Sequence, residues 1–307
     1  MRAYVGVTDG AWASFLRARP VIAEVNFWQP STLSAFRALT PGQPFLFKTH
    51  WPHNRLVGGF FSGHTNLLLS EAWRLFGEGN GVSSHTAMRA AIARYRREEL
   101  RPGGDPMIGC ILLRDVYFVA EHNEVAAPPD FAKNVARGKV YDLAASSGSY
   151  VERALSHLIR RSDMAADLVD GPVFGQPRLV APRVGQQAFK ALVQSAYHRR
   201  CAITGARITP TRQAAHIRPV GAGHGGENRV DNGLLLRSDV HTLFDEGYLG
   251  IDTSSRLHVS PRLRADFENG SEFYDRAGRT IDLPDARANR PGKEAVTWHM
   301  DTVYRSR

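Results

Sequence analysis

Between residues 201 and 247 the sequence contains, in order, Cys201-Ala-Ile-Thr-Gly205, Ala214-Ala-His-Ile-Arg-Pro219 and Asp231-Asn-Gly-Leu-Leu-Leu-Arg-Ser-Asp-Val-His-Thr-Leu-Phe-Asp-Glu-Gly247. These stretches predict a strand, a long loop, a second strand and a helix. Residues Gln213–Ile217 form the first strand, and Leu234-Leu-Leu forms the second after a glycine-rich loop at 221–226. Ser238 is predicted to cap the helix, which places His241 in its first turn.

This arrangement offers the groups that hydrolysis of a phosphodiester requires. Such a reaction needs a base that takes a proton from water, a cation that neutralises developing charge, and a group that steadies the leaving oxygen. His216, at the end of the first strand, is the candidate base, because an imidazole of ordinary pKa is largely unprotonated at neutral pH. Asn232 is expected to orient His216 by bridging loop backbone, although before Gly233 it is also a common turn residue.

A metal site is predicted on the helix. His241 and Asp245 are four positions apart, so they project from one helix face and can hold one divalent cation, Mg²⁺ or Mn²⁺. Alternatively, Asp245 forms a local ion pair. No structural zinc is expected, because Cys110 and Cys201 are too few and too far apart for a thiolate site. The candidate ligands for DNA phosphates are Arg199, Arg200, Arg218 and Arg237.

These motifs resemble those of HNH endonucleases in the ββα-metal superfamily, in the branch written Ala-His-Ile-x-Pro, Asn-Gly-Leu-Leu-Leu and His-x-Leu-Phe-Asp-x-Gly. The spacing of His216, Asn232 and His241 agrees with the family pattern, which implies a one-metal nuclease with these three catalytic residues. Many family members carry a metal-binding Asp or His before the base histidine, where this chain has Ala215. Water and substrate phosphate are expected to complete the metal shell.

The amino-terminal part has a different pattern. Short apolar runs with β-branched or aromatic residues predict strands, and these runs are Tyr4–Val7, Val21–Phe27, Pro44–Phe47, Leu56–Phe61, Ile108–Leu113 and Val116–Ala120. Helices are predicted at Gly10–Arg17, capped by Asp9, and at Thr86–Glu98, capped by Ser83 or Ser84. The fold class predicted here is α+β, with a mixed β-barrel.

Two segments of this part combine aromatic rings with amides, His and Lys next to turn residues. A pocket that takes a base out of the DNA stack needs flat rings around the base and polar groups at its edge. The candidates for such a pocket are Asn26, Trp28, Trp51 and Lys48. Packing of Trp28 and Trp51 in the core is an equally good interpretation of each residue taken alone.

The segments Tyr4-Val-Gly-Val-Thr-Asp, Phe45-Leu-Phe-Lys and Leu56-Val-Gly-Gly-Phe-Phe resemble the PUA-like superfamily, which includes EVE, ASCH, YTH and SRA modules. Several of these modules read modified bases by flipping them. Together, the two resemblances imply a modification-dependent restriction endonuclease that recognises a modified base, expected to be a cytosine, and cuts nearby. The alternatives are an HNH nuclease of other specificity and an inactive nucleic-acid reader.

Composition agrees with a soluble DNA-binding protein. The net charge of +9 and pI near 9.9 favour a polyanionic partner, here double-stranded DNA. No apolar run approaches the roughly 20 residues needed to cross a membrane, and residues 1–10 lack an export signal, so a cytoplasmic location is expected. Because one HNH site cuts one strand, a double-strand break requires two protomers or two events, and we expect a homodimer or paired binding.

Three segments are predicted from these patterns. Residues 1–142 form the PUA-like recognition domain, and residues 185–307 form the HNH nuclease domain. Residues 143–184 are predicted to connect them through a helix and a run rich in Gly and Pro.

Overall fold

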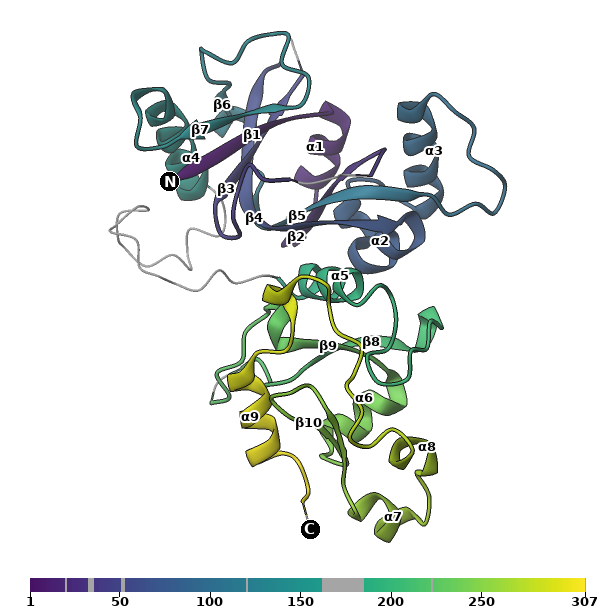
Figure 1. The fold of residues 1–307 in the computed structure, drawn as a ribbon. Coiled ribbons are helices and arrows are strands. Elements are labelled where there is room, and N and C mark those ends of the chain that lie inside the picture. The colour runs from purple at the N-terminus through teal and green to yellow at the C-terminus, as the bar shows by residue number, and fades with distance from the viewer. Residues whose placement is uncertain are drawn as a thin grey trace. The chain divides into compact units, whose positions relative to one another are not determined.

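The computed structural model describes residues 1–19, 21–32, 36–50, 53–119, 121–161, 185–221 and 223–306. The chain divides into two compact units, Met1–Ala188 and Phe189–Arg307 (Figure 1). None of the helices among the described residues has the length and apolar character that crossing a membrane requires.

The first unit is built on a mixed sheet with the strand order β2-β5-β4-β3-β1-β7, and β6 pairs with β4. The strands β1 and β3 are parallel, and the other pairs are antiparallel. Among the described residues β2 and β7 are the edges, so the predicted α+β unit is confirmed, whereas a closed barrel stays a prediction. The strands are β1 (Arg2–Thr8), β2 (Glu24–Gln29), β3 (Pro44–Thr49), β4 (Arg55–Leu68), β5 (Met107–Tyr117), β6 (Val125–Ala126) and β7 (Gly138–Asp142).

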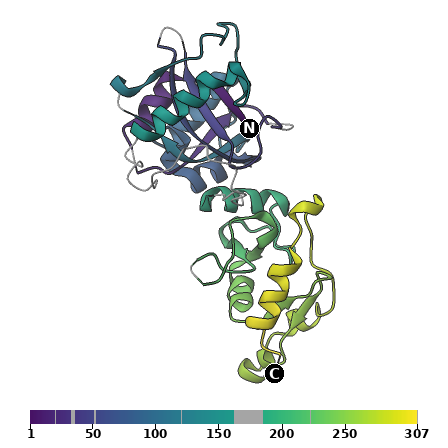
Figure 2. The ribbon, with the colours of Figure 1, turned by 90° about the vertical axis from the view of Figure 1, so that its left-hand side faces the viewer.

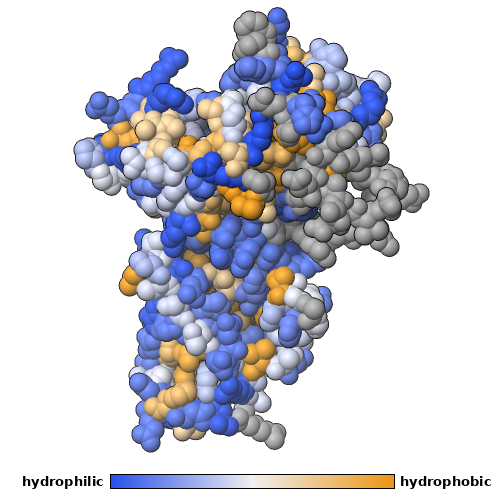
Figure 3. Space-filling model, turned by 180° about the vertical axis from the view of Figure 1, so that it is seen from behind, coloured by the Kyte–Doolittle hydropathy of each residue, from blue (hydrophilic) through white to orange (hydrophobic). Residues whose placement is uncertain are grey.

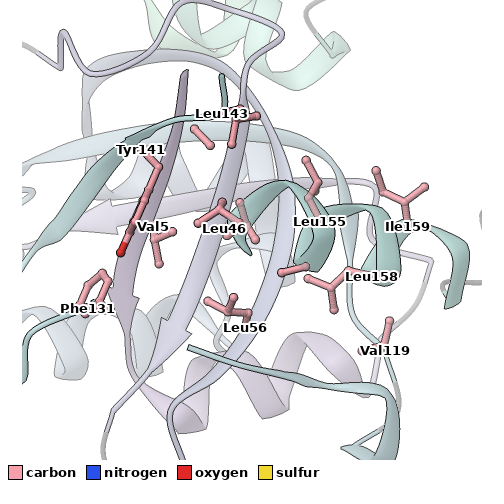
Figure 4. Close-up of a cluster of buried hydrophobic side chains, with 13 residues drawn as sticks. Val5, Leu46, Leu56, Val119, Phe131, Tyr141, Leu143, Leu155, Leu158 and Ile159 are labelled. Atoms are coloured by element: carbon pink, nitrogen blue, oxygen red, sulfur yellow. The ribbon is translucent and has the colours of Figure 1, made fainter. Parts of the chain in front are cut away.

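Helices cover both faces of this sheet. They are α1 (Gly10–Arg17), α2 (Leu69–Phe76), α3 (His85–Arg96) and α4 (Ser149–Arg161). Side chains alternate along β3, so Phe45 and Phe47 join the core on the α1 side, while Leu46 joins the cluster that contains Leu155 and Leu158 of α4 (Figure 4). Because both faces are buried, this strand reads as a continuous apolar run.

The helix caps follow the sequence prediction. The Asp9 carboxylate accepts a hydrogen bond from Ala11 N at 2.8 Å and starts α1. The Ser84 hydroxyl accepts one from Ala87 N at 3.0 Å and starts α3. In both cases the side chain satisfies a backbone donor that the first helical turn leaves open, which fixes where the helix begins.

Other boundaries differ from the prediction. Val21 is 91% exposed, and β2 begins only at Glu24. The predicted strands around residues 108–113 and 116–120 are one strand, β5, which continues past the irregular register near Asp115, a residue with a φ of 48°. Helix α4, predicted to belong to the connection, packs into the core of the first unit.

The second unit contains two small hairpins with helices around them. Its strands are β8 (Arg212–His216), β9 (Gly233–Arg237), β10 (Leu249–Ile251) and β11 (Leu257–Val259). The helices are α5 (Gln186–Ala196), within which the division of the units falls, α6 (Ser238–Asp245), α7 (Arg262–Phe267), α8 (Ser271–Tyr274) and α9 (Lys293–Thr302). Figure 2 shows α9 on the near side of this unit, where it packs against β10.

Hydrophilic residues cover most of the face seen in Figure 3, and hydrophobic residues appear there as small separate patches. The chain has 39 Lys and Arg residues against 30 Asp and Glu residues. This excess of basic residues in the chain favours a polyanionic partner.

Candidate functional site

The β8–β9 hairpin brings the sequence motifs of the second unit together. His216 ends β8 opposite Gly233, the first residue of β9, and α6 follows β9 directly. The helix cap differs from the prediction, because Arg237 is the N-cap residue and Ser238 is the first helical residue. His241 nevertheless lies at the start of α6, on the helix that follows the histidine-bearing hairpin.

His216 is held between a ring and an amide. Its imidazole stacks on Phe189, with ring centroids 4.1 Å apart and planes 6° from parallel. Its Nε2 lies 2.9 Å from the amide oxygen of Asn228. With an oxygen at this position, Nε2 carries the proton and Nδ1 keeps a free lone pair in the neutral ring. Burial holds the pKa of His216 below its ordinary value, while the bond to Asn228 acts in the opposite direction.

The Asn232 side chain forms hydrogen bonds with the backbone of the loop between the two strands. Its amide oxygen accepts from Arg218 N, and its amide nitrogen donates to the carbonyl oxygens of Arg218 and Glu227, each at 2.9 Å. Its backbone oxygen accepts from Ile217 N at 2.9 Å. Asn232 is only 6% exposed, so these bonds lock the backbone that follows His216.

His241 and Asp245 form the second half of the site. The His241 Nε2 lies 3.2 Å from Asp245 Oδ2, and the His241 Nδ1 lies 2.7 Å from the amide oxygen of Gln213. That oxygen accepts the Nδ1 proton, which leaves Nε2 as the nitrogen that faces the carboxylate. Burial raises the pKa of Asp245, while the nearby His241 and His216 lower it. His216 therefore lies within electrostatic range of this pair.

The His241–Asp245 pair fits a divalent cation. Two ligands that each lie about 2.1 Å from Mg²⁺ at right angles are about 3.0 Å apart, close to the separation found here. Among the described residues no set of three His, Cys, Asp or Glu side chains could hold a metal ion. Ala215, at the position where many HNH proteins have a ligand, is fully buried in β8. The two protein donors would therefore need oxygen ligands from water or substrate.

The four candidate arginines lie in different surroundings. Arg237 binds the carboxylates of Asp239 and Glu272, and Arg218 lies 3.3 Å from Glu294 and over the Trp298 ring. The backbone of Arg199 is in the left-handed region, with a φ of 57°. Arg200 is exposed and forms no ion pair among the described residues. Arg200 therefore has the least compensated charge of the four.

The first unit contains a cavity of about 490 Å³, here called the aromatic cavity. Its aromatic lining residues are Trp12, Phe15, Phe27, Trp28 and Tyr95, and its polar lining includes Asp9, Gln29, His50, Ser83 and Arg94. The indole nitrogens of Trp12 and Trp28 both donate to Asn80 O, at 3.1 and 2.9 Å. Gly81 has a φ of +74°, and a Cβ there would lie 2.0 Å from the Trp12 ring. These contacts hold the Trp12 and Trp28 rings in place as walls of the cavity.

A carboxylate lies at the edge of the aromatic cavity. Asp9 accepts a hydrogen bond from Tyr95 Oη at 2.8 Å, and Arg94 lies 3.7 Å from the same carboxylate oxygen. Burial raises the pKa of Asp9, but the hydrogen bonds from Ala11 and Tyr95 outweigh this effect and hold the pKa below its ordinary value. The carboxylate is therefore ionised at neutral pH and can accept further hydrogen bonds.

The predicted pocket residues are separated by the fold. Trp28 lines the aromatic cavity, whereas Lys48 lines a second cavity. Asn26 lines neither, because its side chain is fully buried and its amide donates to Asn80 Oδ1 at 2.9 Å. Trp51 lies outside the described residues.

Several residues that shape these sites carry no signal in the sequence that predicts their role. Asn228 and Gln213 hold the two histidine rings, Phe189 stacks on His216, and Asn80 holds both tryptophans. The amides had no motif that singled them out. No motif singled out Phe189 either, because a contact across the tertiary structure leaves no local pattern.

The comparisons support the carboxy-terminal motifs. Residues 201–252 match the family model described as HNH endonuclease. No curated protein matches the chain.

Solved structures also resemble the chain, at low similarity. One is described as a modification dependent TagI restriction endonuclease, with 16% identity over 87% of this chain and 64% of that one and a TM-score of 0.29. This chain thus spans less than two thirds of that protein. Another is a mutant ASCH protein from Zymomonas mobilis, with 9% identity, coverage of 50% of this chain and 97% of that one, and a TM-score of 0.33. The resemblance to HNH endonucleases is confirmed for the segment that carries His216, Asn232 and His241.

Proposed function

We propose that this protein is a DNA endonuclease that depends on one divalent metal ion and cuts near a modified base read by its first unit. One observation carries the proposal: the His216 ring, held by Phe189 and Asn228, lies within electrostatic range of the His241–Asp245 pair. A base and two candidate metal ligands in one hairpin-and-helix module are the groups that phosphodiester hydrolysis needs.

His216 is the general base of this reaction. Its Nδ1 takes a proton from a water molecule, the water oxygen forms a bond to phosphorus, and the bond from phosphorus to the leaving oxygen breaks. Asn232 holds the backbone after His216, and Asn228 holds its ring. A metal ion bound by His241 and Asp245 would supply positive charge to the phosphate and leaving oxygens. Mg²⁺ and Mn²⁺ both suit an oxygen-rich shell with few protein ligands.

The arginines contribute to phosphate binding in different degrees. Arg200, exposed and without a carboxylate partner among the described residues, is the first candidate for a phosphate contact, with Arg199 beside it. Arg218 and Arg237 must exchange their carboxylate partners for phosphate if they take part.

The aromatic cavity is the proposed base pocket. Trp12 and Trp28 provide flat walls, and the Asp9 carboxylate can accept a hydrogen bond from the exocyclic amine of cytosine. This contact supports a base with an exocyclic amine, a group that cytosine and adenine both carry, and we propose a modified cytosine among them. Trp51 remains a candidate from the sequence, and Asn26 acts behind the pocket wall through Asn80. We further propose double-stranded DNA in the cytoplasm as the substrate and paired protomers as the form that cuts both strands.

The test is cleavage of matched plasmids that are unmodified or carry 5-methylcytosine or 5-hydroxymethylcytosine, with Mg²⁺, Mn²⁺ or EDTA. We expect metal-dependent cutting of a modified plasmid, with His216→Ala slower by about 10²–10⁴-fold, the usual contribution of a general base. Trp28→Ala should reduce the preference for modified DNA without removing the nuclease.

Each part of the proposal has its own contrary result. Equal cutting of all plasmids would reject the base reader and keep the nuclease. Full activity of His216→Ala would reject the assigned base. Absence of cutting on every plasmid with either metal would reject the endonuclease and favour a protein that only binds nucleic acid.

A further inference from the structure

A second cavity of about 390 Å³ lies in the first unit, and we call it the lysine cavity. Its polar lining residues are Lys48, His50, Asn54 and Lys133, and no Asp or Glu is among its described lining residues. Apolar residues, including Phe131 at the margin of the core cluster (Figure 4), form the remaining walls. The lining can therefore carry positive charge without an internal acidic partner.

Lys48 is the unusual member of this lining. It is only 8% exposed, and its Nζ donates to Thr49 O at 3.1 Å and lies 5.3 Å from the Phe131 ring centroid. No carboxylate lies within ion-pair distance of its Nζ among the described residues. By contrast, the half-buried Lys139 of the same unit lies 2.7 Å from Asp130. Burial of a cation without a counter-charge is unfavourable, and it lowers the pKa of Lys48.

The lysine cavity and the aromatic cavity are neighbours. Val7 and His50 line both of them. The two cavities meet where the parallel strands β1 and β3 end, at Thr8 and Thr49, because parallel neighbours finish at the same edge of the sheet. A ligand that puts a flat ring into one cavity therefore has the second cavity beside it.

We propose that the lysine cavity binds a backbone phosphate of the DNA strand whose base enters the aromatic cavity, with Lys48 as the principal cation. The proposal rests on the proposed base-reading function. A phosphate supplies the missing counter-charge for Lys48, and the side chains of Lys133 and Asn54 add donors at the mouth of the cavity. A base and its adjoining phosphate are joined through one sugar, which matches two cavities that share a wall.

Binding measurements test this inference independently of cleavage. Fluorescence anisotropy would follow short duplexes with a central cytosine, 5-methylcytosine or 5-hydroxymethylcytosine, with the His216→Ala protein as the reference. Lys48→Met keeps the length of the side chain and removes its charge, and Lys139→Met removes the charge of a paired, more exposed lysine. We expect Lys48→Met to weaken binding at low salt about tenfold and to reduce the slope of log affinity against log salt by about one. Lys139→Met should leave that slope unchanged.

A second measurement uses the unchanged Lys48 and so does not depend on how the variant folds. Neutral methylphosphonate linkages would replace the phosphates of the duplex one at a time. We expect one linkage next to the central base to weaken binding by the same factor as Lys48→Met, with no further loss when the two changes are combined. If free inorganic phosphate weakens duplex binding by the same factor in the reference protein and in Lys48→Met, that result would instead indicate a general anion site.

The outcomes separate the two proposals. Two results would overturn the phosphate site, whatever the cleavage assay shows. The first is an equal salt slope for Lys48→Met and its reference on every duplex. The second is a combined loss of affinity that equals the product of the separate losses at every linkage. A metal-dependent nuclease that cuts all plasmids equally would overturn the base reader, while a Lys48-dependent salt slope would still support the phosphate site.

Discussion

At the residue scale, both histidines of the candidate site have one ring nitrogen committed to a side-chain amide. Asn228 faces Nε2 of His216, and Gln213 faces Nδ1 of His241. Each amide oxygen fixes the tautomer and leaves the opposite nitrogen for chemistry. In the proposed mechanism the two rings therefore have different tasks, with Nδ1 of His216 available for a proton and Nε2 of His241 for a cation.

The hydrogen bond between His216 and Asn228 predicts how the reaction depends on pH. Asn228→Leu removes a bond that raises the pKa of His216, so we expect this pKa to fall further below its ordinary value and the acid limb of the pH–rate profile to move to lower pH. Asn228→Asp adds a negative charge beside the ring, so the pKa of His216 should rise and the acid limb should move to higher pH. NMR titration of His216 in EDTA and the pH dependence of kcat/KM measure these shifts.

Opposite shifts from the two Asn228 variants distinguish a positioning residue from one that only supports the fold. Asn269→Leu, at an exposed position of the same unit between α7 and α8, serves as the control and should leave the titration unchanged. Shifts of the same sign in both Asn228 variants would show that the hydrogen bond does not tune His216.

At the scale of elements, the site depends on how the long loop returns from β8 to β9. The Asn232 side chain forms three hydrogen bonds with the backbone of Arg218 and Glu227, on the other side of that loop. Because these backbone groups have no helix or sheet partner there, Asn232 substitutes for regular secondary structure.

Asn232→Ala should therefore loosen the loop as well as slow the reaction. The Arg218 N–H and carbonyl groups lose their partner, while Glu227 O keeps its bond from Arg229 N. We expect the free energy of unfolding to fall by about 1–3 kcal/mol, as for buried polar groups left unsatisfied. Urea denaturation of the metal-free protein measures this change, and hydrogen exchange at the Arg218 amide reports the loop itself. An unchanged exchange rate in a fully inactive variant would indicate a direct chemical role for Asn232 instead.

In both units, sequence patterns predicted the helices and strands better than they predicted the contacts between them. Short-range signals were sufficient for the strand before His216, the Asp9 cap and the helix with His241, because strand alternation and capping act over a few residues. The partners Asn228 and Phe189, and the separation of Trp28 from Lys48, depend on tertiary packing. Alternation along β3 contributed to that separation, since Lys48 lies on the side opposite Phe47, towards Phe131.

At the scale of the whole molecule, the proposals assign different work to the two compact units. The two cavities and the buried Lys48, which has no carboxylate partner among the described residues, belong to the first unit, and the histidine site belongs to the second. Changes in one unit should therefore alter discrimination or affinity, while changes in the other alter the chemical step. The net charge of +9 adds attraction for DNA that does not depend on its sequence.

The single candidate nuclease site in the described part of the chain also predicts how the two DNA strands are cut. If paired protomers each cut one strand, mixing wild-type protein with an excess of His216→Ala gives pairs that have one working site. The share of pairs with two working sites then falls as the square of the wild-type fraction. Gel electrophoresis of a supercoiled plasmid in excess should then show nicked circles in place of linear DNA, while serum albumin at the same concentration has no effect. A ratio of linear to nicked product that does not change with the inactive protein would mean that the cuts are independent events by single protomers.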